Sequence, residues 1–191
     1  MRICVYGAAS DEIDRSYLEA GEKLGREMSR RSHSLIFGGG AKGMMGAVAR
    51  GMSENNGYLK GIVPHFFNVD GALYEKCNEM IKTQTMRERK KLMEESSDAF
   101  IVTPGGIGTF EEFFEILTLR SLDRHKKPIA ILNTNGYYND LLSFLKNGVE
   151  QNFLREGNLE LFYVSDDISA LLDYLENYSD DSDYIGKTRF N

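Results

Sequence analysis

A chain of 191 residues, of which 41% are hydrophobic, can bury one sizeable core. Its 23 lysine and arginine residues and 29 aspartate and glutamate residues give a net charge of −6, which argues against non-specific binding along a nucleic acid. The sequence shows no apolar run long enough to cross a bilayer and no secretion signal, so we expect a cytoplasmic protein that does not enter membranes.

The two cysteines, Cys4 and Cys77, are far apart, and Cys4 lies within an apolar strand pattern. This arrangement favours reduced thiols over a disulfide framework or a metal site. The three histidines are not clustered with other ligands, so we expect no structural metal.

Short apolar strand patterns alternate with helical spacing along the chain, and glycine-rich turns separate several of them. The expected strands are 2–6, 34–37, 59–63, 99–103 and 128–132. The expected helices are 13–31, a segment around Met44, Met45 and Val48, 86–97, 110–120, 137–151 and 168–175. This alternation predicts an α/β fold, a doubly wound parallel sheet with helices on both faces.

We expect one domain over residues 1–175, followed by an acidic C-terminal tail over 176–191. Asp180, Asp181 and Asp183 lie in that tail, which has little to bury and is expected to fray.

The turn after the second expected strand contains Gly38, Gly40 and Gly43 in the spacing G-x-G-x-x-G. The pattern falls in the second strand–helix unit, so it does not indicate a nicotinamide cofactor. Two interpretations stay open: the glycines allow tight packing of strand against helix, or they line a ligand pocket. A second glycine-rich turn at the same edge of the sheet favours a pocket.

A cationic run follows at 86–91, where Met86 precedes Arg87, Glu88, Arg89, Lys90 and Lys91. Such runs are usually solvated surface. The chain offers few other cationic clusters, however, and a guanidinium suits bidentate contact with phosphate or carboxylate. Arg89 and Lys90 are therefore the leading anion ligands.

The second glycine-rich turn, 104–109, follows an expected strand and opens a helix rich in carboxylates. Its glycines let the backbone approach a ligand, and the helix start directs unpaired N–H groups at an anion, which indicates a phosphate site. Thr109 and Glu112 also have the spacing of a capping box. A first-turn position should keep Glu112 ionised, although Glu111, Glu112 and Glu115 are each also compatible with solvated helix charges.

Three groups of residues carry a resemblance to a known family: 37–46, Met86 with Arg89 and Lys90, and 104–109 with Glu112. Together with 127–142 they resemble the LOG (Lonely Guy) family of cytokinin riboside 5′-monophosphate phosphoribohydrolases, over nearly the whole chain to about Leu175. Members are also labelled lysine decarboxylases, but nothing in this sequence indicates a pyridoxal-phosphate lysine.

The resemblance implies a Rossmann-like domain, a homodimer with the active site near the subunit interface, and no organic cofactor or metal. It implies hydrolysis of an N-glycosidic bond to release a free base and ribose 5-phosphate, with Arg89 and Glu112 as catalytic residues. The implied contacts to a nucleoside 5′-monophosphate are Glu79, Met86, Arg89, Lys90, Gly105, Gly106, Ile107, Gly108, Thr109 and Glu111.

The implied chemistry suits these residue types. Cleavage of a ribosyl C–N bond develops oxocarbenium character, which the Glu112 carboxylate would stabilise while it directs a water molecule. Arg89 would orient Glu112 or hold the substrate, and the loop amides would bind the phosphate. The alternative is a non-catalytic nucleotide or molybdenum-cofactor carrier of the same fold. The sequence leaves open whether AMP or an N6-substituted nucleotide is the substrate.

Overall fold

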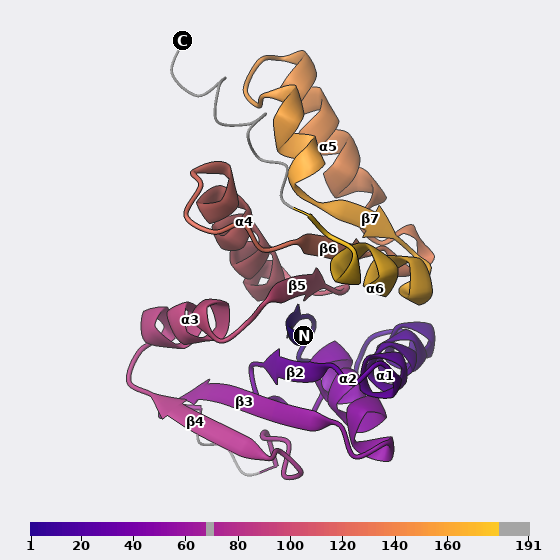
Figure 1. Ribbon diagram of the computed structural model, residues 1–191, viewed down its shortest axis with the longest axis vertical. Coiled ribbons are helices and arrows are strands. Elements are labelled where there is room, and N and C mark those ends of the chain that lie inside the picture. Colours follow the sequence, from indigo (N-terminus) through magenta and orange to yellow (C-terminus); the bar gives the residue numbers. More distant parts are fainter. Residues whose placement is uncertain (68–70, 180–191) are drawn as a thin grey trace.

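Seven parallel strands form one sheet in the computed structural model, which describes residues 1–67 and 71–179 (Figure 1). The strands are β1 (Arg2–Tyr6), β2 (Ser34–Phe37), β3 (Tyr58–Pro64), β4 (Glu79–Thr83), β5 (Ala99–Val102), β6 (Ile129–Leu132) and β7 (Tyr163–Ser165). The α-helices are α1 (Arg15–Arg30), α2 (Gly43–Glu54), α3 (Met86–Glu95), α4 (Ile107–Ser121), α5 (Asn139–Glu150) and α6 (Ile168–Glu176). Two 3-10 helices, Thr134–Gly136 and Glu156–Leu161, complete these elements.

The strand order is β4-β3-β2-β1-β5-β6-β7, and all six pairings are parallel. The chain first builds outward from β1 to β4, then returns to the other side of β1 with β5. The direction of winding therefore reverses between β1 and β5. In such doubly wound sheets the carboxyl ends of the two strands at this point leave a crevice for ligands.

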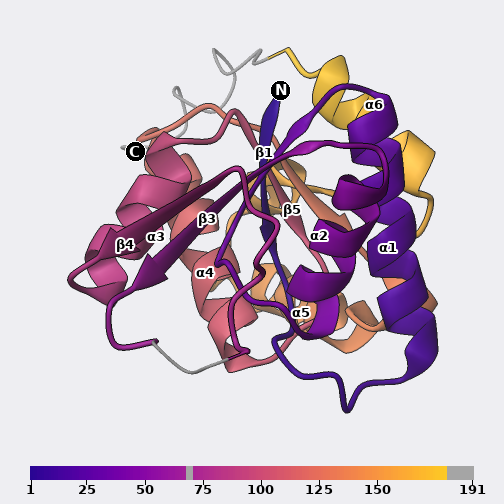
Figure 2. The ribbon, with the colours of Figure 1, turned by 90° about the horizontal axis from the view of Figure 1, so that it is seen from below.

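Helices cover both faces of the sheet, as Figure 2 shows with α1, α2 and α6 on one side and α3 and α4 on the other. Alternate residues of β1 point to opposite faces: Ile3 and Val5 pack in the core under the first group, and Cys4 and Tyr6 in the core on the opposite face. Both faces of the central strands are thus apolar, as expected for a parallel sheet. The predicted fold class is confirmed.

Two strands escaped the sequence analysis. Both lie at the edges of the sheet: β4 is mostly half-buried and includes the exposed Lys82, and β7 spans only three residues. Neither has the buried apolar run that marks the central strands. Asp180, Asp181 and Asp183 of the expected tail lie outside the described residues, whereas Glu176 belongs to α6.

Within the described residues, no helix has both the length and the apolar character needed to span a bilayer.

Candidate active site

A pocket of about 520 Å³ lies at the carboxyl edge of the sheet, where the winding reverses. The turns after β1, β2 and β5 and the amino-terminal turns of α3 and α4 form most of its wall. Its lining includes Lys42, Met86, Arg89, Gly106, Gly108, Thr109, Glu111 and Glu112. Both glycine-rich turns thus contribute to one pocket, as their positions in the sequence predicted.

A buried ion pair forms the centre of this wall. Arg89 Nη1 lies 3.0 Å from Glu112 Oε1, and Arg89 Nε donates to the Ile62 carbonyl at 3.1 Å. The two charged side chains are only 9% and 10% exposed. Because burying charged groups is costly even when they are paired, such a pair in a pocket indicates a functional role.

The position of Arg89 depends on two local features. Thr85 caps α3 by accepting from the Glu88 N–H at 3.1 Å, so Arg89 lies one turn inside the helix and faces the sheet. The guanidinium then packs on Gly38, where a Cβ atom would lie 2.1 Å from Arg89 Nη2. Gly38 therefore provides room for the arginine as well as lining the pocket.

The capping box predicted for Thr109 and Glu112 is wrong. Helix α4 begins at Ile107 with Gly106 as its N-cap, so Thr109 is already the third helical residue and Glu112 lies in the second turn. Burial raises the pKa of Glu112, while the charge of Arg89 and its hydrogen bond act in the opposite direction. The expected effect of the helix dipole is thus outweighed by burial.

The amino end of α4 has unused hydrogen-bond donors. Among residues 1–67 and 71–179, no acceptor meets the backbone N–H groups of Ile107, Gly108 or Thr109. The amino end of α2 differs, because Asp11 accepts from the Gly43 N–H at 2.7 Å and the Ala8 carbonyl from the Met45 N–H at 3.3 Å. The amino end of α4, rather than that of α2, therefore has free backbone N–H groups that can bind an anion.

Two tyrosine hydroxyl groups bind backbone carbonyls of the loop that precedes α4. The Tyr137 hydroxyl donates to the Gly105 carbonyl and the Tyr138 hydroxyl to the Thr103 carbonyl, each at 2.7 Å. With these carbonyls engaged, the loop is fixed in position beside the pocket.

Four predicted contact residues do not line the pocket. Lys90 binds Glu111 and lies 2.8 Å from Glu115, so it neutralises the outer carboxylates of α4. Ile107 is 85% exposed, and Gly105 is buried in the loop beneath it. Glu79 begins the edge strand β4, where Lys60 lies 3.3 Å away and the Tyr58 hydroxyl 3.0 Å away.

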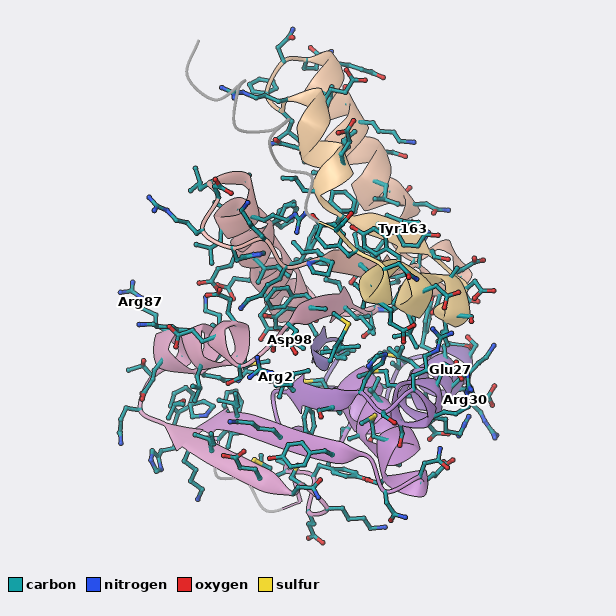
Figure 3. The ribbon with its side chains drawn as sticks, viewed as in Figure 1. Arg2, Glu27, Arg30, Arg87, Asp98 and Tyr163 are labelled. Carbon is teal, nitrogen blue, oxygen red and sulfur yellow. The ribbon has the colours of Figure 1, made fainter. Side chains whose placement is uncertain are left out.

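Arg87, within the predicted cationic run, extends from α3 into solvent in Figure 3 and is the solvated residue that such runs usually contain.

The segment 72–74 was not expected near the site. Leu73 bridges Gly40, and the Ala41 N–H donates to the Ala72 carbonyl at 2.9 Å. No periodicity in the sequence could have revealed this pairing between two loops.

Comparisons with known proteins identify the relatives of this chain. A family model described as "Possible lysine decarboxylase" matches residues 45–175. A probable cytokinin riboside 5′-monophosphate phosphoribohydrolase of Oryza sativa subsp. japonica, LOGL9, is 36% identical over 93% of this chain and 78% of its own length. The Arabidopsis thaliana phosphoribohydrolase LOG3 is 36% identical over 93% of this chain and 83% of its own.

Among solved structures, a molybdenum cofactor binding protein from Rippkaea orientalis has a TM-score of 0.68 at 19% identity, covering 92% of this chain and 95% of that chain. This likeness shows a shared fold. The relatives, by contrast, are similar in sequence over almost the whole chain, and we conclude that the chain belongs to the LOG family of cytokinin riboside 5′-monophosphate phosphoribohydrolases.

Proposed function

We propose that this protein hydrolyses the N-glycosidic bond of cytokinin riboside 5′-monophosphates, AMP, or both, releasing the free base and ribose 5-phosphate. The observation that carries the proposal is the buried pair Arg89–Glu112 in the wall of a pocket that also contains the open amino end of α4. The activity named for the relatives supports it.

Glu112 acts on the reacting centre. As the bond from the ribose C1′ to the base nitrogen breaks, the bonding electrons leave with the base and positive charge develops on the sugar. The Glu112 carboxylate stabilises this charge and accepts a proton from the water that attacks C1′, and the departing base nitrogen takes up a proton from solvent; the return of the Glu112 proton to solvent balances the step. A carboxylate whose pKa is raised by burial is a stronger base for this purpose.

Arg89 holds Glu112 in place and neutralises it in a site with little water. The N–H groups of the first turn of α4, from Ile107 to Thr109, bind the 5′-phosphate, and Met86 contributes an apolar contact in the same pocket. Glu111 contacts the substrate at the edge of the pocket, and Lys90 holds Glu111 in place through their ion pair. This scheme uses no contact from Glu79.

The proposal includes a homodimer with the pocket near its interface. The exposed apolar residues Ile107, Phe114 and Leu122 all lie on or next to α4, which carries Glu112, and a second subunit would cover them. Light scattering should give twice the 21.6 kDa chain mass.

A cytoplasmic location is also proposed, and the free thiols Cys4 and Cys77 suit a reducing compartment.

The decisive test of the activity is release of free base from AMP and from isopentenyladenosine 5′-monophosphate, measured side by side by chromatography. Release establishes the phosphoribohydrolase and ranks the two substrates. Tight nucleotide binding without release would favour the carrier alternative. Release of carbon dioxide from lysine, with a pyridoxal absorbance, would instead support the decarboxylase label.

A further inference from the structure

Among the described residues that line the pocket, two carry cationic side chains, and these differ in what they already bind. The guanidinium of Arg89 is committed to Glu112 and to the Ile62 carbonyl. The ammonium group of Lys42 has neither an ion pair nor a hydrogen bond with any residue in the described part of the chain, and Lys42 is exposed.

The carboxylates of the described wall are already paired with other cations. Glu112 lies beside Arg89, and Lys90, from outside the lining, is shared by Glu111 and Glu115. Lys42 is therefore the positive charge of the described wall that is left without an ion-pair partner to meet a bound molecule. A nucleoside 5′-monophosphate brings an anionic phosphate, which needs such a charge more than the base or the ribose does.

Backbone contacts place Lys42 on the same side of the pocket as the amino end of α4. Ala8 joins the two segments: its N–H donates to the Pro104 carbonyl at 3.0 Å, and its carbonyl accepts from the Met45 N–H at 3.3 Å. Lys42 is the N-cap of α2, three residues before Met45, and Gly106, two residues after Pro104, is the N-cap of α4. Both N-caps line the pocket on either side of Ala8.

We propose that Lys42 is a specificity-determining residue that binds the 5′-phosphate together with the amides of α4, and so selects nucleotides over nucleosides. This inference rests on the proposed function for the identity of the ligand. It assigns Lys42 to substrate selection and leaves bond cleavage to Glu112.

The test compares the parent protein with Lys42→Met and Lys42→Arg, using AMP and adenosine as probes. Calorimetry gives Kd, and base release gives KM and kcat. Lys42→Met keeps most of the side-chain stem but removes its charge, so Kd and KM for AMP should rise about 10- to 100-fold, as for loss of a charged hydrogen bond. Binding of adenosine should change less than about twofold, and Lys42→Arg should restore most of the affinity for AMP.

Lys146→Met is the matched control, because Lys146 is an exposed lysine of α5 that does not line the pocket. It should leave all constants unchanged. Unchanged affinity of Lys42→Met for AMP would overturn the inference, as would equal weakening for AMP and adenosine, or a parent protein that binds AMP no better than adenosine. If the parent binds AMP without releasing base, the hydrolase proposal fails while the binding comparison still decides the role of Lys42.

Discussion

Glu112 is buried beside Arg89, and this environment sets the acid limit of the proposed reaction. Burial raises the pKa of Glu112 above the ordinary glutamate value of 4.5. Since the carboxylate must be ionised to act, kcat should fall as pH decreases through this raised pKa. A pH–rate profile should therefore show an acid limb above 4.5. An acid limb at or below 4.5 would show that burial does not control this group.

Gly38 offers a second test at single-residue resolution. In Gly38→Ala the added Cβ would lie 2.1 Å from Arg89 Nη2 and displace the guanidinium, so kcat should fall by about 100-fold or more. Gly40→Ala is the matched control, because its Cβ would meet only the flexible end of Met45 at 3.1 Å. Steady-state kinetics on both variants checks this, and equal losses would contradict it.

The sequence identified the pair at the centre of the site, because Arg89 and Glu112 each belong to a distinctive motif. The family resemblance also led us to expect that Arg89 could orient Glu112, but the local pattern around Glu112 pointed to a different partner. The spacing of Thr109 and Glu112 indicated a capping box, yet α4 begins at Ile107, so Glu112 turns inward and meets an arginine 23 positions away. Local spacing carries no information about such a tertiary partner.

Helices α1 and α2 approach closely through glycines. In Gly25→Ala the new Cβ would lie 2.1 Å from the Val48 carbonyl oxygen, which is backbone and cannot move aside easily. We expect the free energy of unfolding to fall by about 1–3 kcal/mol. Gly157→Ala, where no atom lies within 4 Å of the new Cβ, should have little effect. Chemical denaturation checks both, and an unaffected Gly25→Ala would contradict this packing.

An ionic cluster joins α1 to α6. Arg31, the residue that follows α1, lies 2.7 Å from Glu27 of that helix and 3.0 Å from Glu176 on α6, and Glu27 also pairs with Arg30; Figure 3 labels Glu27 and Arg30. Hydrogen bonds from Arg30 and Arg31 lower the pKa of Glu27 to about 2. A carboxylate with a depressed pKa stabilises the fold above its unfolded pKa, and this contribution is lost as pH falls through the folded value.

Glu27→Gln should therefore lower the melting temperature at neutral pH, by the equivalent of about 0.5–1 kcal/mol for a surface pair. The difference from the parent protein should shrink as pH falls from 4.5 towards about 2. Thermal melts across this range check the sign. A difference that does not depend on pH would contradict an electrostatic origin.

At the scale of elements, buried strands and amphipathic helices could be predicted because their apolar spacing is strong. The edge strands β4 and β7 could not, since β4 is mostly half-buried and lacks a buried apolar run, and β7 is only three residues long. The Leu73 segment reaches the site only through its pairing with Gly40. It is the tertiary structure, not a local pattern, that brings this part of the chain to the pocket.

For the whole molecule, the position of the site follows from topology. The winding of the sheet reverses between β1 and β5, and their carboxyl ends lead into the turns that form the pocket. Strand alternation predicted this edge from the sequence alone. The same topology is shared with a molybdenum cofactor binding protein, so the fold does not decide the chemistry. We propose that Arg89 and Glu112 decide it.

The most direct test is therefore base release from AMP and isopentenyladenosine 5′-monophosphate by the parent protein and by Glu112→Gln, with circular dichroism and AMP binding measured on both. Glu112→Gln preserves shape and removes the charge, so turnover should fall by about 100-fold or more while folding and binding persist. Near-parental turnover in the folded variant would contradict the central role of Glu112 and with it the proposed mechanism.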